Sequence, residues 1–386
     1  MKKLFYEDTH ILDFETTVVS CTPDEKGKNY LLVLEETAFF PEEGGQPADT
    51  GTLNGMPVLD VQIKKDIIYH IVKQPLEIGQ SVCGQVDWKR RFDFMQQHSG
   101  EHIISGLLHK HFGFNNVGFH LGLSEVTLDF DGVIDMTQLK EIESEANQIV
   151  WKNLPVYATF PDKDVLSTLS YRSKIEIEGP VRIVEIPGVD VCACCAPHVE
   201  RTGEIGLIKI TNVQNHRGGV RINILCGERA LNDYSARLEA CNAISVLLSA
   251  KPERIVEAVK KVQDDTLQLK VTANQLANQL LSRETSALAT PEFCNNPILF
   301  VELSNPVAIR NTVNELTEKY DGYCGIFNGN DNAGYSFIIG SKTLDCRTIA
   351  SALREELSAK GGGTAPMIQG NVTATKEQLE VFFAKL

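Results

Sequence analysis

The sequence predicts an α+β protein built from four segments, and three observations support this expectation. Residues 1–88 contain short apolar or alternating runs separated by turn residues, which is typical of a small β-barrel or sandwich. Helical and strand-like patterns then alternate over residues 89–235, as in an α+β core. Residues 236–290 have helical periodicity, and residues 291–386 mix both patterns again, which predicts a separate C-terminal α/β domain.

The strands of the first segment are expected at 30–34, 58–62 and 67–71, between clusters of Gly, Pro, Asp and Asn. The second segment opens with a proline-free helical stretch around residues 95–108. A second helix is expected after Asp135, a plausible N-cap. Strand-like runs lie between and after these helices, at 126–130, 181–185, 206–210 and 220–224.

The third segment carries apolar residues spaced alternately four and three apart. They are Ile255, Val259, Val262, Thr266, Leu269, Ala273, Leu276 and Leu280. This heptad seam is compatible with packing on its own domain, with an antiparallel helical hairpin, or with a dimeric coiled coil. In the fourth segment, strands are expected at 298–301 and 336–339. A helix over 348–360 would end at Gly361-Gly-Gly363.

Charge and composition limit the functions that are expected of the chain. The chain has 37 Lys and Arg against 51 Asp and Glu, and its net charge of -14 argues against nucleic-acid binding unless a local basic patch exists. No apolar stretch follows Met1-Lys-Lys3 as in a signal peptide, and no run approaches the roughly 18 residues of a membrane span. A cytoplasmic protein without membrane contact is therefore expected.

Two motifs predict a metal site. His98-Ser-Gly-Glu-His102 places two imidazoles on one face of a helix, although such a pair also arises by chance. Cys194-Cys-Ala-Pro-His198 supplies a thiolate and a third imidazole over the same five-residue reach. Seven other cysteines are scattered singly, but Cys192, Cys194 and Cys195 cluster, as metal ligands do in reducing compartments.

Together the two motifs offer a tetrahedral nitrogen and sulfur site, which favours zinc over magnesium or calcium. We expect one Zn²⁺ per chain, held by His98, His102, Cys194 and His198, although spacing alone does not choose between Cys194 and its neighbouring cysteines. A zinc peptidase of the HExxH type is not indicated, because Ser99 follows the first histidine and Glu101 lies elsewhere on the helix turn.

Four motifs, in this order, resemble the editing domain of alanyl-tRNA synthetase and the free-standing AlaX-type alanyl-tRNA editing proteins. They are Phe39-Phe-Pro-Glu-Glu-Gly-Gly-Gln-Pro47, Arg90-Arg91 with the zinc helix, Arg182-Ile-Val-Glu-Ile186 with the cysteine loop, and Thr202-Gly-Glu-Ile-Gly206. Lys360-Gly-Gly-Gly-Thr364 with Gln369-Gly370 is similar to the DHHA-type domain that ends these synthetases. The resemblance is therefore greatest to the long AlaX form. Ala196-Pro197 departs from the Gly-Thr pair that usually stands in the metal loop.

The resemblance implies a zinc-dependent hydrolase that removes serine or glycine from mischarged tRNA for alanine. It implies catalytic roles for Thr37, Gln46 and His120, the last standing where a family glutamine is expected. It implies substrate contacts by Gly44, Gly45, Arg91, Gly361, Gly362 and Gly363, where the three C-terminal glycines would form a phosphate-binding nest. Thr37 is equally compatible with an ordinary strand residue, and Gly44-Gly45 with a plain turn.

Two alternative functions have to be weighed against editing. A module that holds the tRNA acceptor end without catalysis has the same motifs. A phosphoesterase is disfavoured, because the chain has no Asp-His-His motif. The partners expected are mischarged tRNA for alanine and a second copy of the chain, joined through the helical connector or the C-terminal domain.

Overall fold

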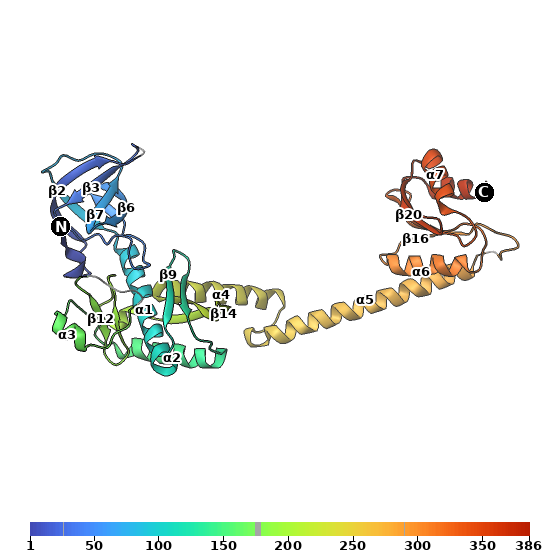
Figure 1. The fold of residues 1–386 in the computed structure, drawn as a ribbon. Coiled ribbons are helices and arrows are strands. Elements are labelled where there is room, and N and C mark those ends of the chain that lie inside the picture. Colours follow the sequence, from blue (N-terminus) through green and yellow to red (C-terminus); the bar gives the residue numbers. More distant parts are fainter. Residues whose placement is uncertain (26, 174–178, 289) are drawn as a thin grey trace. The chain divides into compact units, whose positions relative to one another are not determined.

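The computed structural model describes residues 1–25, 27–173, 179–288 and 290–386. The chain divides into two compact units, Met1–Cys241 and Asn242–Leu386. Each unit combines helices with β-sheets, so the α+β class predicted from the sequence is confirmed (Figure 1). The expected boundary between residues 235 and 236 falls inside the helix α4 (Gly227–Leu247), and the remaining segment limits stay predictions.

The first unit begins with six strands that close on themselves in the order β2-β3-β7-β6-β5-β8. Alternate residues of each strand point inward, as the regular burial pattern of β8 illustrates. Large apolar side chains such as Leu32, Leu53 and Ile68 fill the interior with no exposed surface. The strands are β2 (Asp13–Pro23), β3 (Tyr30–Leu34), β5 (Gly51–Leu53), β6 (Met56–Lys64), β7 (Ile67–Val72) and β8 (Ser81–Val86).

The start of the chain is tied to this barrel. Strand β1 (Lys2–Lys3) pairs in parallel with β4 (Glu36–Thr37), which directly precedes the predicted glycine-rich motif. A short 3-10 turn, η1 (Leu4–Tyr6), then buries Leu4 and Phe5 in the barrel core. The N-terminal residues are thereby held next to the glycine-rich segment.

The long helix α1 (Trp88–Phe112) leaves the barrel and forms the centre of the first unit. The Asp87 side chain accepts a hydrogen bond from the Arg90 backbone N–H and caps its start, and Gly113, with φ of 70°, ends it in the left-handed conformation. Its middle section is buried on all sides rather than along one stripe. This section is surrounded by protein, and so His98 and His102, which lie in it, face the interior.

Two sheets and a second helix surround α1. The capping box of Asp135 and Gln138 starts α2 (Met136–Lys152), which shares its apolar core with α1. The larger sheet has the order β14-β15-β10-β9, and the smaller one has the order β11-β12-β13. Their strands are β9 (Asn116–Leu121), β10 (Val126–Phe130), β11 (Tyr157–Thr159), β12 (Ile183–Ile186), β13 (Asp190–Ala193), β14 (Ile208–His216) and β15 (Gly219–Cys226). The remaining elements are α3 (Lys163–Thr168) and η2 (Thr202–Ile205).

The second unit contains a long helix and a five-stranded sheet in the order β16-β17-β18-β20-β19. Only β16 and β17 are parallel, so the sheet is mixed rather than the largely parallel one of most α/β domains. The strands are β16 (Ile298–Val301), β17 (Cys324–Asn330), β18 (Gly334–Gly340), β19 (Lys360–Thr364) and β20 (Met367–Val372). The helices are α5 (Ile255–Ser286), preceded by η3 (Pro252–Arg254), α6 (Pro306–Thr317), α7 (Cys346–Leu357) and α8 (Lys376–Phe383).

The helix expected over residues 348–360 is shorter than predicted. It ends at Leu357 because Ser358 takes a left-handed φ of 55°, and Lys360 already belongs to β19. The three glycines that follow are therefore strand residues and not a helix terminus. Among the described residues, no helix is both long and apolar enough to cross a membrane.

Candidate metal centre

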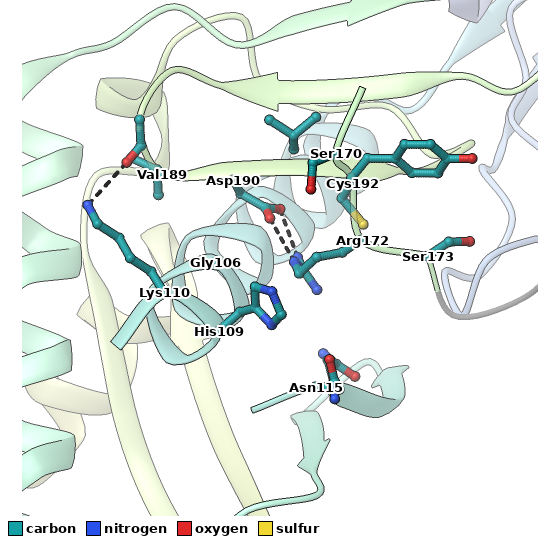
Figure 2. Close-up of a pocket in the computed structure, with 14 residues that line it drawn as sticks. Gly106, His109, Lys110, Asn115, Ser170, Arg172, Ser173, Val189, Asp190 and Cys192 are labelled. Atoms are coloured by element: carbon teal, nitrogen blue, oxygen red, sulfur yellow. Dashed lines mark hydrogen bonds and ion pairs between the residues drawn. The ribbon is translucent and has the colours of Figure 1, made fainter. Parts of the chain in front are cut away.

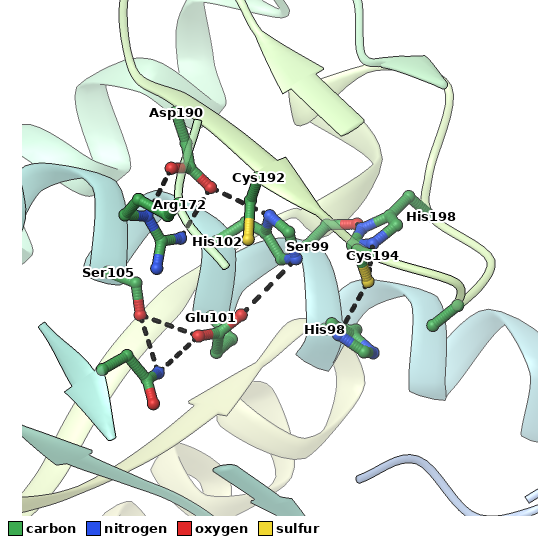
Figure 3. Close-up of polar contacts among 12 residues, drawn as sticks. His98, Ser99, Glu101, His102, Ser105, Arg172, Asp190, Cys192, Cys194 and His198 are labelled. Carbon is green, nitrogen blue, oxygen red and sulfur yellow. Dashed lines mark hydrogen bonds and ion pairs between the residues drawn. The ribbon is translucent and has the colours of Figure 1, made fainter. Parts of the chain in front are cut away.

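Two distant parts of the sequence bring four metal-binding side chains together. His98 and His102 lie one turn apart on α1, and Cys194 and His198 lie on the loop after β13 (Figure 3). Their candidate ligand atoms all lie within 4.8 Å of one another. Cys194 Sγ is 3.5 Å from His98 Nε2 and 3.3 Å from His198 Nε2. The four predicted ligands thus form a buried cluster that could hold a metal ion.

Each imidazole of the cluster is held from its far side. His98 Nδ1 lies 2.9 Å from Gln46 Oε1, and His102 Nδ1 lies 2.9 Å from Asp190 Oδ2. For the third ring, His198 Nδ1 lies 3.0 Å from the hydroxyl of Ser99. Oxygen acceptors at Nδ1 favour a proton there and leave the lone pair of Nε2 for a metal, which is how metal-binding histidines are usually oriented.

The amide of Gln46 supports this assignment. Its side chain is fully buried, and with its oxygen directed at His98 its Nε2 has no hydrogen-bond partner among the described residues. If the amide were turned, Gln46 Nε2 would donate to His98 Nδ1. The His98 proton would then lie on Nε2, which faces the Cys194 thiol. Three imidazole nitrogens and one thiolate, with Nδ1 protons directed outward, fit a tetrahedral metal ion.

Electrostatics favour a thiolate in the cluster. Burial raises the pKa of the Cys194 thiol, but the nearby imidazoles of His98 and His198 outweigh it, so this pKa lies well below its usual value. Burial lowers the pKa of His198 to about 3. For His102, burial is outweighed by hydrogen bonds with Asp190 and Cys194, which raise its pKa well above the usual value. A metal ion would replace the proton on His102, because a metal-bound imidazole is neutral.

The geometry distinguishes Cys194 from its two neighbours. Cys192, on β13, lies instead within 4.8 Å of candidate ligand atoms of His102 and Asp190. Cys195 Sγ lies only 3.0 Å from the position that a Cβ on Gly44 would take, so it packs against the glycine-rich turn. Arg182 fixes the loop by donating to the backbone oxygens of Cys194 and Ala196, at 3.1 and 2.8 Å.

The glycine-rich motif forms a tight turn against the cluster. Glu43 and Gln46 exchange backbone hydrogen bonds of 3.2 and 3.1 Å, and Gly44 and Gly45 have φ values of 63° and 80°. A Cβ on Gly45 would lie 2.9 Å from the Phe119 backbone oxygen. Both the left-handed φ values and the close approach to neighbouring segments therefore require glycine here.

A cavity of about 1320 Å³ lies beside the cluster and has walls from the barrel and from the α+β core. Its lining includes Gly44, Gly45, His98, His102 and Cys194, so the structure brings these predicted residues to one space. Basic residues also line it, namely Lys2, Lys3, Lys65 and Arg182. Acidic residues line it as well, namely Glu7, Glu43, Asp66 and Glu101, so the wall carries charges of both signs and the local basic patch stays a prediction.

Thr37 and Gln46 lie behind the cavity wall. Thr37 is fully buried, and its hydroxyl lies 2.8 Å from His70 Nε2 and accepts from the Phe39 N–H at 3.1 Å. Gln46 contacts His98 and is not among the lining residues. In this structure Gln46 therefore positions a metal ligand, and Thr37 fixes the segment that leads into the glycine-rich turn.

Arg91 and His120 do not line the cavity. Arg91 is fully buried, where its guanidinium forms an ion pair with Asp49 and donates to the Ala38 oxygen, so a substrate contact would require these bonds to break. On β9, Phe119 faces the cluster, with its ring centroid 4.7 Å from that of His98. The adjacent His120 is exposed on the opposite face of the strand, which argues against the catalytic role expected for it.

The three C-terminal glycines lie in the second unit and do not form a nest. Gly361, Gly362 and Gly363 pair with β20 in an extended edge strand. Glycine is needed at the outer two positions, since a Cβ there would lie 2.3 Å from the backbone oxygens of Gln369 and Met367. The backbone nest expected at these glycines is therefore not formed, because a nest requires turned rather than extended backbone, and their contact with substrate stays a prediction.

The sequence analysis missed four residues near the cluster: Ser99, Glu101, Phe119 and Asp190. Glu101 was set aside as lying elsewhere on the helix turn, yet it lines the cavity and is only 2% exposed. Asp190 carries its carboxylate between His102 and Arg172, and the hydrogen bonds to both outweigh burial and hold its pKa at about 2. One signal in the sequence could have found Asp190. It lies two residues before Cys192 on a strand-like segment, and residues two apart on a strand point to the same face.

A second hollow of about 460 Å³ lies on the other side of Asp190 (Figure 2). Lys110, His109 and Arg172 lie on its wall. Arg172 binds Asp190 through two hydrogen bonds of 2.7 and 2.8 Å, and Lys110 donates to the Gly188 oxygen. Arg172 and Lys110 are thus already bonded, Arg172 to the Asp190 carboxylate that supports His102 and Lys110 to the nearby Gly188 backbone oxygen.

Comparison with known proteins relates two parts of the chain to aminoacyl-tRNA synthetase domains. Residues 181–223 match the model of the threonyl and alanyl tRNA synthetase second additional domain, which here contains the cysteine loop. Residues 2–90 match the model of class II (A) tRNA synthetases. The fold and these matches thus define a protein with a domain similar to the second additional domain of these synthetases, which here carries a cluster that could hold a metal ion.

More particular relatives align over almost the whole chain. Alanyl-tRNA editing protein Aarsd1 of Rattus norvegicus is 29% identical over 99% of this chain and 96% of its own. Alanyl-tRNA editing protein AlaX-L of Pyrococcus horikoshii is 26% identical, with 98% and 96% coverage. The alanine–tRNA ligase of Ignicoccus hospitalis is 29% identical over 74% of this chain but only 32% of its own. The chain is therefore a homologue of alanyl-tRNA editing proteins over nearly its full length, and the resemblance recognised in its motifs is confirmed.

Proposed function

We propose that the chain is a trans-editing hydrolase that removes serine or glycine from mischarged tRNA for alanine, with one Zn²⁺ per chain held by His98, His102, Cys194 and His198. One observation carries the proposal: His98, His102 and Cys194 of the four-residue cluster line a cavity that Gly44 and Gly45 of the glycine-rich turn also line. The names of the relatives that align over nearly the full chain support the same activity.

Zinc is the metal that best fits three imidazoles and one thiolate. When bound, it would supply positive charge next to the ester carbonyl, and its four protein ligands would hold it in place. The residues of the chain do the rest of the binding. The turn carries the backbone of Gly44 and Gly45 to the cavity wall, and backbone N–H groups are suitable donors to the developing oxyanion of an ester under attack by water.

The basic residues of the cavity lining are the groups that would contact tRNA, although acidic residues also line the cavity. Lys65 and Arg182 line the cavity beside Lys2 and Lys3. The last two form surface ion pairs with Glu7 and Asp66, at 3.1 and 2.7 Å. Exposed pairs of this kind are weak, so phosphate groups near the acceptor end can compete for the lysines, and binding should fall as salt rises.

Selectivity requires a second sieve, because serine and alanine differ by one hydroxyl, which simple binding discriminates by only about 1–3 kcal/mol. We propose that Thr37 contributes to this sieve. Its hydroxyl is bonded to His70 and to the Phe39 N–H, so its influence would pass through the position of the segment that continues into Gly44 and Gly45.

The decisive test is incubation of the purified, zinc-loaded protein with tRNA for alanine carrying serine, glycine or alanine. We expect the first two to be deacylated and alanyl-tRNA to be spared. Tight binding of all three without hydrolysis would instead identify a non-catalytic acceptor-end module. Failure to bind or cleave any of them would refute both functions.

The second unit is proposed to serve tRNA docking and self-association. Along α5, Val262, Leu269 and Leu276 are 51%, 70% and 59% exposed, at the spacing of a coiled-coil seam. A second copy of the chain is the natural partner for such a seam. Sedimentation equilibrium should show a dimer that Leu269→Lys weakens, whereas Lys270→Leu, a change beside the seam, serves as control. A monomer at all concentrations would exclude this role.

The docking role has its own test. A chain that ends after α4 at Leu247 keeps all four metal ligands and the cavity. It should retain zinc and lose about tenfold in affinity for tRNA, which corresponds to about 1.4 kcal/mol. Equal tRNA affinities for the shortened and complete chains at one salt concentration would exclude tRNA docking by the second unit. Self-association would then be its remaining proposed role.

A further inference from the structure

We infer that Phe160 stacks on the terminal base of tRNA and so positions the aminoacyl ester beside the metal cluster. This inference rests on the proposed function, in which the cavity receives the aminoacylated end of tRNA. Phe160 follows β11 directly and lines the cavity together with His98, His102 and Cys194. It is 49% exposed, although phenylalanine is usually buried. An apolar ring that is open to a ligand cavity is suited to bind a ligand group there.

The ring of Phe160 is supported by an aromatic neighbour. Its centroid lies 5.4 Å from that of the Tyr6 ring, and the two ring planes make an angle of 70°, so the contact is edge-to-face. Tyr6 belongs to η1, whose Leu4 and Phe5 are buried in the barrel core. An edge-to-face contact leaves at least one face of each ring uncovered by the other. Phe160 therefore has a fixed support and can still offer a ring face to a planar group.

A short series of contacts connects Phe160 with the metal cluster. The guanidinium carbon of Arg182 lies 5.1 Å from the centroid of the Tyr6 ring. Arg182 in turn donates to the backbone oxygen of the metal ligand Cys194, at 3.1 Å. Tyr6 and Arg182 both line the cavity, so these contacts run along its wall. Phe160 is thus placed to bind a part of the substrate that is adjacent to the ester, rather than the ester itself.

The terminal nucleoside of tRNA matches this arrangement. Its ribose carries both the aminoacyl ester and the base, so the two groups have to be bound at neighbouring places. A base has a flat π-face and stacks on aromatic side chains whatever its identity. Serine and glycine have no apolar surface that could cover a phenylalanine ring, so the aminoacyl group is not the partner of Phe160. The ring therefore recognises that the ester is carried by a nucleoside, and not which amino acid is attached.

The test is a double-mutant cycle on binding affinity. The ligand is tRNA for alanine that carries serine through a stable amide in place of the ester, and it ends either in adenosine or in a ribose without a base. We expect the wild-type protein to bind the adenosine form roughly tenfold more tightly, the usual strength of one base stacked on an aromatic ring. Phe160→Ala should bind the two forms equally. Phe160→Tyr keeps the ring and should preserve the difference.

The matched control is Tyr157→Ala, which removes a nearby aromatic ring outside the cavity. Tyr157 lies on β11 and is 52% exposed, but it does not line the cavity, so this variant should keep the wild-type difference. A third ligand, which ends in guanosine, tests stacking itself. It should bind nearly as tightly as the adenosine form, because stacking tolerates a change of base. The metal content of each variant is measured in parallel.

The outcomes separate this inference from the proposed function. If the wild-type protein binds the amide but does not cleave the corresponding ester, the deacylase function fails, while the binding cycle still decides the role of Phe160. That role is overturned if the wild-type protein binds the adenosine and base-free forms equally, or if metal-loaded Phe160→Ala keeps the difference. It is also overturned if guanosine costs as much affinity as the missing base, which would indicate recognition by hydrogen bonds. No binding of any form would refute both claims.

Discussion

Two histidines of the first unit, His70 in the barrel and His102 in the core, are both buried but have different surroundings. His70 meets the Thr37 hydroxyl at 2.8 Å and the Leu32 backbone oxygen at 3.3 Å. Burial among these uncharged partners lowers its pKa to about 4. His102 meets the Asp190 carboxylate, and its pKa is raised well above the usual value although burial opposes this.

The contrast shows what distinguishes a histidine of the core from a histidine of a site. Burial alone makes an imidazole neutral and leaves it a polar residue whose hydrogen bonds are satisfied. A carboxylate behind one nitrogen, and a thiol and two imidazoles in front of the other, make it a candidate metal ligand.

Removal of a ligand should empty the metal site. His102→Ala and Cys194→Ala should each reduce zinc from about one per chain to a small fraction and abolish deacylation, because three ligands hold the ion much less tightly. Elemental analysis after gel filtration measures this loss. His70→Gln is the matched control and should keep its zinc. Full zinc occupancy in Cys194→Ala would show that Cys192 or Cys195 supplies the sulfur.

The carboxylate behind His102 should matter less than the ligand itself. Asp190→Asn should weaken zinc binding by roughly tenfold to a hundredfold, the usual effect of losing such a supporting group. Competition with a chelator of known affinity gives the number. Asp129→Asn is the control, since Asp129 forms a similar two-bond pair with Arg221, at 2.6 and 2.8 Å, away from the cluster. Equal zinc affinity in the two variants would contradict a role for Asp190 in metal binding.

The barrel histidine should make stability depend on pH. Because the pKa of folded His70 is about 4, below the usual 6.5, the unfolded chain binds the proton more tightly between these values. Its contribution is complete above pH 6.5 and declines as the pH falls toward 4. Between pH 7.5 and 5 the loss should be about 2 kcal/mol of unfolding free energy. Urea unfolding measures it, and His70→Gln should flatten this part of the profile; an unchanged slope would mean that His70 titrates normally.

Thr37→Val should have the smallest effect. The substitution removes the hydroxyl that joins His70 to the Phe39 N–H and should cost about 1–2 kcal/mol of stability. If Thr37 also contributes to selectivity through the glycine-rich turn, the ratio of seryl-tRNA to alanyl-tRNA hydrolysis should fall. Lower stability with a wild-type ratio would show that Thr37 is a structural residue of the barrel alone.

The sequence predicted those parts of the site in which spacing within one element determines geometry. The pair His98 and His102 follows from the helical repeat, and the loop from Cys194 to His198 follows from its short reach. Pairing across strands was not predictable in the same way. Whether Phe119 or His120 faces the cluster depends on the register of β9 against β10, where Phe119 pairs with Leu128.

The same limit applies to the fold. The burial of α1 on all sides depends on sheets and a helix that come later in the chain, so the sequence placed Glu101 only elsewhere on the helix turn and did not predict its burial. The three glycines after α7 were equally suited to ending a helix or to lying close against another strand. Their partner β20 follows only after a short turn, and it decided the outcome. The local sequence pattern thus predicted the helices and strands themselves better than it predicted which elements pack against them.

The buried ion pair of Arg91 and Asp49 has a consequence for how this part of the protein can be inherited. Arg91 belongs to α1, whereas Asp49 follows the glycine-rich turn and accepts from the Phe40 backbone N–H. Arg91 also donates to the backbone oxygens of Thr9 and Ala38. A recombination that joined the barrel of one relative to the core of another would leave a charge buried and unpaired unless both parents carried this pair, at a cost of about 3–5 kcal/mol. Barrel and core are thus expected to pass between lineages as a single block.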